Sequence, residues 1–163
     1  MVNKLEVAWT LATVALITGV AVYSTILVYH LDTLPGDPTE YVDVTGHQWY
    51  WEFCYPANVS KSGCFNSSYD PTTNTVSGGA LWAPPGAVVQ VNVTGADVIH
   101  SFNIPQLGVR IDAIPDRVNH FAFTVPDVAP GTAYLIQCTE FCGTFHGTMR
   151  SFLEISDPTS GTS

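Results

Sequence analysis

Residues 138–149 (CTEFCGTFHGTM) carry most of the side chains of this chain that could bind a transition metal. Cys138 and Cys142 supply two thiols, His146 an imidazole and Met149 a thioether. Soft sulfur donors combined with a nitrogen donor suit copper, whereas magnesium and calcium prefer oxygen. Met149 is one of only two methionines in the chain, so its place three residues after His146 points to a ligand. The spacing predicts a copper site.

Other interpretations of the two cysteines are less consistent with this spacing. A disulfide between Cys138 and Cys142 would join residues that a strand or extended loop usually holds too far apart. A zinc site normally uses more cysteine or histidine ligands and no methionine. A single blue-copper site uses one cysteine, two histidines and a weak axial methionine. The second cysteine therefore favours a site that bridges two metal ions.

The segment resembles the dinuclear copper (CuA) loop of cytochrome c oxidase subunit II, C-x-E-x-C-x3-H-x2-M, and all the named positions match. The resemblance implies that the sulfurs of Cys138 and Cys142 bridge both copper ions. It further implies that the loop provides three more ligands: His146, Met149 and the backbone carbonyl of Glu140. In oxidases with this glutamate, its carboxylate helps to bind a magnesium ion at the interface with subunit I.

A dinuclear site needs a second imidazole, and the chain has four other histidines, His30, His47, His100 and His120. By itself, a lone histidine such as His100 is more often structural than metal-binding. Residues 97–101 (DVIHS), however, resemble the D-V-x-H-S segment of subunit II. That resemblance implies that His100 is the first copper histidine, while His47 and His120 are read as ordinary surface or core residues and His30 lies at the membrane edge.

Residues 46–53 (GHQWYWEF) are rich in aromatic side chains and predict a strand. A period of two places Trp49, Trp51 and Phe53 on one face, which a core strand alone would explain. The segment also resembles the G-x-Q-W-Y-W motif of subunit II. The resemblance implies that Trp49 lies near the copper centre, at the surface where the donor docks, and passes electrons inward.

Residues 107–117 (LGVRIDAIPDR) resemble another subunit II segment, L-G-x-K-x-D-A-I-P-G-R, with Arg110 in place of lysine and Asp116 in place of glycine. In the family this segment lies near subunit I and the donor surface. Asp97 and Asp112 are therefore candidate acidic docking groups, and the alternative is that both are simply solvated charges.

Cys54 and Cys64 lie ten residues apart, separated by the Pro, Ser and Gly residues typical of a hairpin loop. We expect a structural disulfide, worth roughly 3 kcal/mol by loop entropy, and hence a compartment outside the cytoplasm. Asn58, Asn66 and Asn92 match glycosylation sequons, which also occur by chance. Residues 65–79 read as a long polar loop without chemistry.

Residues 7–31 contain no Asp, Glu, Lys or Arg. As a helix of about 36 Å they would cross a hydrocarbon core of roughly 30 Å. A cleaved signal peptide is the alternative, but its apolar region is usually shorter, roughly 7–15 residues. We expect a retained single-pass anchor in a prokaryotic plasma membrane, with the N-terminus inside and the following domain on the outer face. Most subunit II chains have two such helices.

The chain is organised as an anchor (1–31), a Pro/Gly/Asp-rich linker (32–40), a domain that holds the copper site (41–156) and a polar tail (157–163). Strands are expected at residues 41–45, 88–94, 119–125, 133–137 and 148–155. Several short strands separated by turns predict an all-β sandwich or barrel. Together with the position of the ligand loop between the last two strands, this pattern resembles the cupredoxin Greek-key fold.

The formal charge of −9 argues against nucleic acid and suits a basic soluble partner, although acidity also serves solubility. The family resemblance implies subunit II of a haem–copper terminal oxidase. Such a subunit accepts electrons from cytochrome c or a blue-copper protein and passes them to haem in subunit I. Both copper cysteines are present, which distinguishes the chain from quinol oxidase relatives. A membrane-anchored copper carrier or assembly protein is the competing hypothesis.

Overall fold

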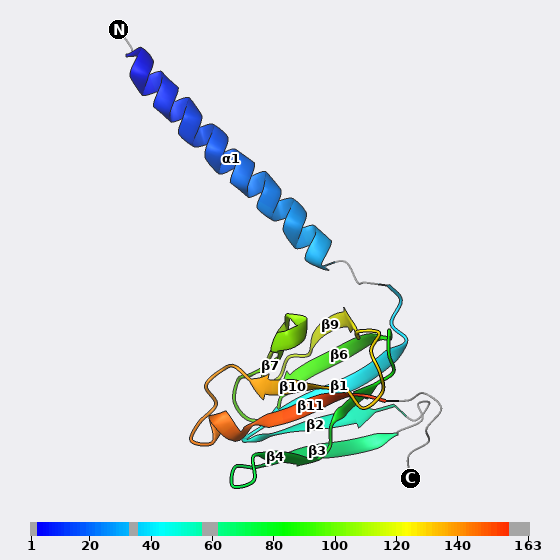
Figure 1. Cartoon of the computed structure of the whole chain (residues 1–163). Helices are drawn as coiled ribbons and strands as arrows, with labels where there is room; N and C mark the ends of the chain where they lie inside the picture. Colours follow the sequence, from blue (N-terminus) through cyan, green and yellow to red (C-terminus); the bar gives the residue numbers. More distant parts are fainter. Residues whose placement is uncertain (1–2, 33–35, 57–61, 157–163) are drawn as a thin grey trace. The chain divides into compact units, whose positions relative to one another are not determined.

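The computed structural model describes residues 3–32, 36–56 and 62–156. The chain divides into two units, Met1–Leu34 and Pro35–Ser163. In the first, helix α1 (Lys4–Asp32) begins earlier than the apolar run because the Asn3 side chain accepts the Leu5 N–H at 3.1 Å and caps the helix. The span Lys4–His30 contains an 18-residue window that has a mean hydropathy of 2.1 and no buried residue, so the helix is long and apolar enough to cross a membrane (Figure 1).

The second unit is built from two β-sheets. The larger has the strand order β4-β3-β2-β1-β6-β9, and its neighbours are antiparallel except for the parallel pair β1 and β6. Its strands are β1 (Glu40–His47), β2 (Tyr50–Tyr55), β3 (Gly63–Asp70), β4 (Thr75–Gly78), β6 (Val88–Gly95) and β9 (Asn119–Thr124).

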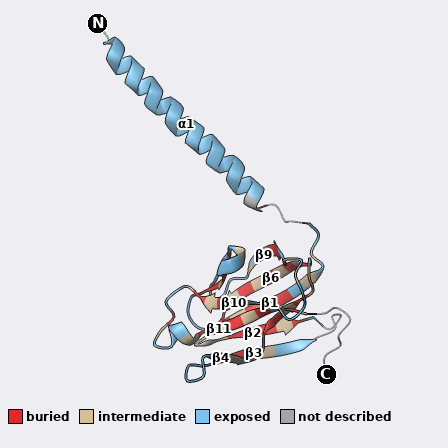
Figure 2. Cartoon of the chain, viewed as in Figure 1, coloured by how far each residue is buried: buried red, intermediate tan, exposed pale blue. Residues whose placement is uncertain are grey.

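The smaller sheet has the order β5-β11-β10-β7-β8. Its strands are β5 (Leu81–Ala83), β7 (His100–Ile104), β8 (Val109–Ala113), β10 (Ala133–Cys138) and β11 (Arg150–Ile155). Two 3-10 turns, η1 (Pro105–Leu107) and η2 (His146–Thr148), interrupt the connections. Alternate residues of both sheets are buried between the layers, as Figure 2 shows by the red segments along the strands. The prediction of an all-β domain behind one apolar helix is confirmed.

The strand expected over residues 46–53 is wrong in one respect. β1 ends at His47 and β2 starts at Tyr50, so Gln48 and Trp49 form the turn of a hairpin. Trp51 and Phe53 are fully buried, as the alternation requires, whereas Trp49 is half-buried at the tip. Sequence periodicity could not show the break because the aromatic density continues across it.

The polar loop expected over residues 65–79 is also wrong. Residues 63–78 form the β3–β4 hairpin at the edge of the larger sheet. Ser67 is buried there, and its hydroxyl accepts the Trp51 N–H at 2.9 Å. Strand β3 is held in register by its pairing with β2. Its residues do not alternate between apolar and polar, so the sequence carries no amphipathic signal for this strand. The sequence did not predict strands β5, β7 and β8 either, and β7 and β8 begin or lie in segments that were identified only by their resemblance to subunit II.

Candidate metal centre

The ligand loop joins β10 to β11 and is closed at its base. Cys138 is the last residue of β10, and its backbone N–H donates to the Met149 carbonyl at 3.1 Å. The turn η2 then brings the chain back, with the Met149 N–H donating to the His146 carbonyl at 3.3 Å. Figure 1 shows this orange loop at one end of the sandwich. Strand pairing therefore fixes both ends of the segment that carries the predicted ligands.

Strand pairing also positions the remote histidine. β7 runs antiparallel to β10, with Phe102 opposite Cys138, and the Thr139 N–H donates to the Ser101 carbonyl at 3.0 Å. His100 starts β7 and is completely buried. A residue 38 positions away in sequence is thus held beside the loop by the register of two neighbouring strands.

The structure brings all the predicted ligands together. The sulfurs of Cys138 and Cys142 are 3.9 Å apart, and both cysteines are free and buried. The other short contacts are Cys138 Sγ to His100 Nδ1 (3.9 Å), Cys142 Sγ to His146 Nδ1 (3.4 Å), Cys142 Sγ to Met149 Sδ (3.9 Å) and Cys138 Sγ to the Glu140 carbonyl oxygen (3.2 Å). Each cysteine thus faces one imidazole.

The two thiols differ in acidity. Burial disfavours the Cys138 thiolate, but hydrogen bonds, chiefly with the His100 ring, outweigh it and lower the pKa of Cys138 to about 7. Burial and the charge on Cys138 raise the pKa of Cys142 to about 12. Burial lowers the pKa of His100, yet its contacts with Cys138 and Asp97 raise it overall. Cys138 therefore ionises more readily than Cys142.

Asp97 supports the buried histidine. Its carboxylate oxygen Oδ1 lies 2.8 Å from His100 Nε2 and accepts the Val98 N–H at 2.6 Å. The second oxygen accepts the Gln48 N–H at 2.7 Å. Burial raises the pKa of Asp97, but these hydrogen bonds prevail and lower it below its usual range. A carboxylate on the far nitrogen of a ligand imidazole fixes the ring's orientation, a role that the sequence analysis missed.

The β1–β2 turn clamps the other side of the site. Gln48 Nε2 and Trp49 Nε1 both donate to the Cys142 carbonyl, at 2.7 and 3.2 Å. Gly143, with φ +120°, leaves room for the Gln48 and Trp49 side chains to reach this carbonyl. A Cβ at position 143 would lie only 3.1 Å from Gln48 Nε2 and 3.2 Å from Trp49 Nε1. The turn therefore joins Asp97, and through it His100, to the loop that carries the remaining ligands. The sequence reading had assigned Gln48 no role.

A second polar group lies on the side of Glu140. Arg110 Nε donates to the Ser101 hydroxyl at 3.2 Å, and its Nη2 is 4.0 Å from carboxylate oxygens of both Asp112 and Glu140. All three charged side chains are about half exposed. The structure thus places Asp112 beside Arg110.

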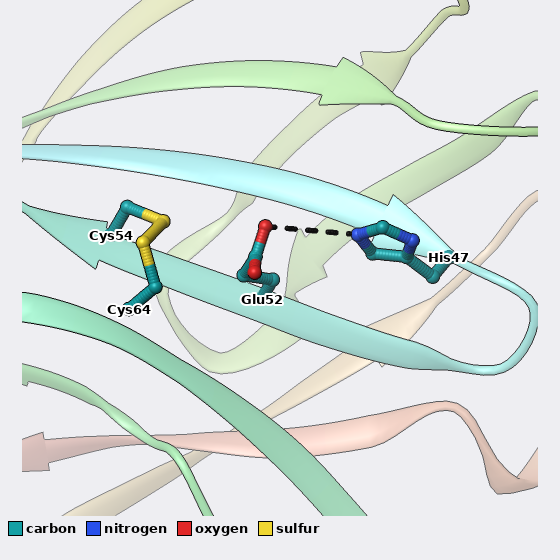
Figure 3. The surroundings of a disulfide bond; sticks show 4 residues. All are labelled: His47, Glu52, Cys54 and Cys64. Atoms are coloured by element: carbon teal, nitrogen blue, oxygen red, sulfur yellow. Dashed lines mark ion pairs between the residues drawn. A yellow bond between two sulfur atoms is a disulfide. The ribbon is translucent and has the colours of Figure 1, made fainter.

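Cys54 and Cys64 form a disulfide that links β2 to β3 (Figure 3). Their sulfurs lie close to the Glu52 carboxylate, but sulfurs joined to each other are not available to a metal. Glu52 faces His47 at 3.7 Å, and the His47 ring stacks on Tyr50.

The two remaining histidines of the β domain lie outside the cluster. His47 belongs to this stacked group, and His120 Nδ1 lies 2.7 Å from the Asn92 side-chain oxygen. The Asn92 side chain in turn donates to Asp43 at 2.7 Å. Asn58, the first residue of the first sequon, lies outside the described residues.

The sulfur and nitrogen atoms that the structure brings together are donors that suit copper. Two unjoined thiols, two ring nitrogens and one thioether face each other in a pocket that is mostly buried. A hard cation would find only the Glu140 carbonyl among them. Two sulfurs that each face one imidazole nitrogen would suit a pair of soft or borderline metal ions better than one.

Comparison with known proteins gives a consistent result. A family model described as cytochrome c oxidase subunit II, periplasmic domain, matches residues 41–155. Cytochrome c oxidase subunit 2 of Metridium senile is 36% identical over 158 residues, covering 92% of this chain and 62% of that protein. The corresponding protein of Cyanidium caldarium is 34% identical over 161 residues, with the same two coverages. The chain thus spans less than two thirds of the length of these relatives.

A solved structure agrees in fold. The crystal structure of the periplasmic domain of subunit II of cytochrome oxidase (CoxB) from Bradyrhizobium japonicum has a TM-score of 0.66 and 34% identity, covering 77% of this chain and 88% of that one. The predictions of family and of a cupredoxin-like fold are confirmed.

Proposed function

The chain belongs to the cytochrome c oxidase subunit II family, and on that premise we propose that it is the subunit through which a haem–copper oxidase receives its electrons. The soluble donor would be a cytochrome c or a blue-copper protein, and the acceptor a haem in subunit I, where oxygen is reduced to water. The observation that carries the proposal is the cluster of two free, buried cysteines with one imidazole against each sulfur.

His100, Cys138, Cys142, His146, Met149 and the Glu140 carbonyl would hold a dinuclear copper centre. Bound copper would supply reversible one-electron oxidation and reduction. The chain's own contribution is rigidity, because strand pairing fixes both ends of the loop and Asp97 orients His100. Ligands held in one geometry keep the reorganisation on electron transfer small.

Trp49 is proposed to be the point at which electrons pass inward. Its indole N–H donates to the carbonyl of Cys142, which itself supplies a sulfur ligand, and its ring packs edge-on against Phe145 at 4.9 Å. The ring is half-buried, so one edge lies at the surface while the other touches the ligand loop. We expect Trp49→Ala to slow oxidation of the donor and to leave the copper spectrum intact.

Glu140, Arg110 and Asp112 are proposed to face subunit I. The Glu140 carboxylate is exposed and directed at Arg110, so it remains free to share a magnesium ion with groups of another subunit. Asp97 and Asp112 remain proposed docking charges. The Asp97 carboxylate is already hydrogen-bonded to Gln48, Val98 and His100, and its influence on a donor would act over a distance.

Helix α1 is proposed to anchor the chain in a prokaryotic plasma membrane, with the N-terminus in the cytoplasm and the copper domain outside. The Cys54–Cys64 disulfide supports that side, because disulfides persist in oxidising compartments.

A copper carrier would need exposed, labile ligands, whereas here His100 and Met149 are fully buried and Cys138 and Cys142 nearly so. That burial favours a redox centre. The test is to load the full chain in detergent with copper and to count the metal. We expect about two copper atoms per chain, a purple colour and the delocalised hyperfine pattern of a mixed-valence pair, lost in Cys142→Ser. The control Cys54→Ser/Cys64→Ser should retain the pair. A blue single-copper spectrum, or copper that a chelator removes at once, would contradict the proposal.

A further inference from the structure

Two neighbouring strands of the larger sheet carry glycine where their pattern calls for valine. The last three residues of β1 that face the core are Val42, Val44 and Gly46, and those of β6 are Val91, Val93 and Gly95. The parallel register sets each residue of the first row beside its counterpart in the second, so Gly46 lies beside Gly95. Both rows therefore lose their side chains at the same level, which leaves a recess in the inner face of the sheet.

The backbone itself does not require glycine at either position. Neither Gly46 nor Gly95 has a positive φ, and both lie in regular strand pairing. Glycine weakens a strand interior and often marks a place where another group approaches the backbone closely. A Cβ at Gly95 would lie 2.7 Å from the Val98 carbonyl oxygen and 2.9 Å from that of Ala113. A Cβ at Gly46 would lie 2.9 Å from Cδ2 and 3.0 Å from Cγ of His100. The recess therefore receives the His100 ring and the backbone beside it.

Gly46 completes the enclosure of the His100 ring. Nε2 of the ring lies 2.8 Å from the Asp97 carboxylate, and Nδ1 lies 3.9 Å from the Cys138 sulfur. The Trp51 ring packs edge-on against the imidazole, with centroids 6.1 Å apart, and the backbone of Gly46 lies against Cδ2 and Cγ. Because His100 is completely buried, its ring cannot swing into solvent to avoid a new neighbour.

We propose that Gly46 is a positioning residue of the metal centre, because its missing side chain sets how far the His100 ring lies from the larger sheet and so from the Cys138 sulfur. The inference rests on the proposed function and adds a residue that is not itself a ligand. A methyl group at position 46 would displace the ring by about 0.5 Å, the difference between 2.9 Å and the 3.4 Å of ordinary contact. Metal sites are sensitive to displacements of this size in their ligands.

The effect of Gly46 reaches one half of the centre. His100 faces the Cys138 sulfur, whereas His146 faces the Cys142 sulfur from the other side of the loop. The atoms nearest to a Cβ at position 46 belong to His100 and Trp51 alone. An unpaired electron is shared equally by two copper ions only when their surroundings are similar. A side chain at position 46 would therefore make the two halves unequal without removing a ligand.

The experiment compares Gly46→Ala with Gly79→Ala in the full chain in detergent. A Cβ at Gly79 would be at least as crowded, but its three nearest atoms, all at 2.7 Å, belong to Phe65. Both variants should lose stability in urea unfolding, so stability alone does not separate them. Two other measurements do. One is the hyperfine pattern after copper loading, and the other is the ring N–H resonance of His100 in the copper-free chain with isotope-labelled histidine, assigned by its absence in His100→Gln.

We expect Gly79→Ala to keep the hyperfine pattern and the His100 resonance of the parent. Gly46→Ala should bind as much copper as the parent, show the pattern of an electron localised on one copper ion, and shift the His100 resonance because the bond to Asp97 changes. A folded Gly46→Ala chain with the parent's pattern or the parent's resonance would overturn the inference, and so would the same changes in Gly79→Ala.

If Gly46→Ala does not fold in detergent alone, both variants are measured with trimethylamine N-oxide, an osmolyte that favours the folded state. Failure to fold there as well would assign Gly46 to folding alone and overturn the positioning role. A parent chain that binds no copper pair would instead overturn the proposed function, and the copper-free resonance would still test whether Gly46 positions His100.

Discussion

Replacing Gly143 by alanine should weaken the clamp between the β1–β2 turn and the ligand loop. A non-glycine residue at φ +120° costs about 1–3 kcal/mol. The added Cβ would also lie 3.1 Å from Gln48 Nε2 and 3.3 Å from Trp49 Cζ2. Moving either side chain weakens a hydrogen bond to the Cys142 carbonyl, worth about 0.5–1.5 kcal/mol each. With both hydrogen bonds weakened, we therefore expect a total loss of about 2–6 kcal/mol in the free energy of unfolding.

The assay is urea unfolding of the copper-free chain in detergent, followed by tryptophan fluorescence, with a Gly63→Ala control. Gly63 has nearly the same backbone angle, φ +116°, but a Cβ there would meet only Phe65 Cζ at 4.0 Å. The control should lose the backbone cost alone, so the two variants should differ by about 1–3 kcal/mol. Equal losses would refute the view that the turn and the loop are packed against each other, since only Gly143 approaches Gln48 and Trp49.

Three further outcomes are expected. Met149→Leu conserves volume in a fully buried position, so stability should fall by less than about 1.5 kcal/mol while the absorption spectrum of the copper-loaded chain shifts. Cys54→Ala/Cys64→Ala should cost about 3 kcal/mol in urea unfolding and leave copper uptake unchanged. Burial raises the pKa of Tyr55 above its usual range. Its contribution to stability is therefore complete below about pH 10 and is lost as the pH rises further, and Tyr55→Phe should reduce that alkaline loss in pH-dependent thermal unfolding.

The ligand loop was predictable because its chemistry is local. Four of the predicted ligands lie close together in sequence, at the end of β10 and in the loop that leads to β11: Cys138, Cys142, His146 and Met149. Their spacing alone predicts a shared metal. The core strands were predictable for a similar reason, since Trp51 and Phe53 alternate with polar residues and are fully buried. His100 was identified only by resemblance, because no local pattern distinguishes a ligand from a structural histidine.

The features that were missed depend on contacts between segments distant in sequence. The β3–β4 hairpin takes its register from β2, through the Cys54–Cys64 disulfide and the buried Ser67 hydroxyl, and polar strands of this kind lack a period-two signal. Asp97 was interpreted as a candidate docking group or a solvated charge, because its partner Gln48 lies in a turn that is distant in sequence. Packing decided both outcomes, and neither could be read from a single window of sequence.

The position of His100 beside the two cysteines depends on the register between β7 and β10. Phe102 pairs with Cys138, and with this register the buried His100 side chain lies against the Cys138 sulfur. Because side chains alternate between the faces of a strand, a slip of one residue would turn His100 away and expose Phe102. Phe102 is wholly buried against Trp51, with ring centroids 5.4 Å apart. The same apolar contact that stabilises the core therefore selects the register that brings the remote imidazole to the thiols, so that folding and formation of the proposed metal site share one determinant.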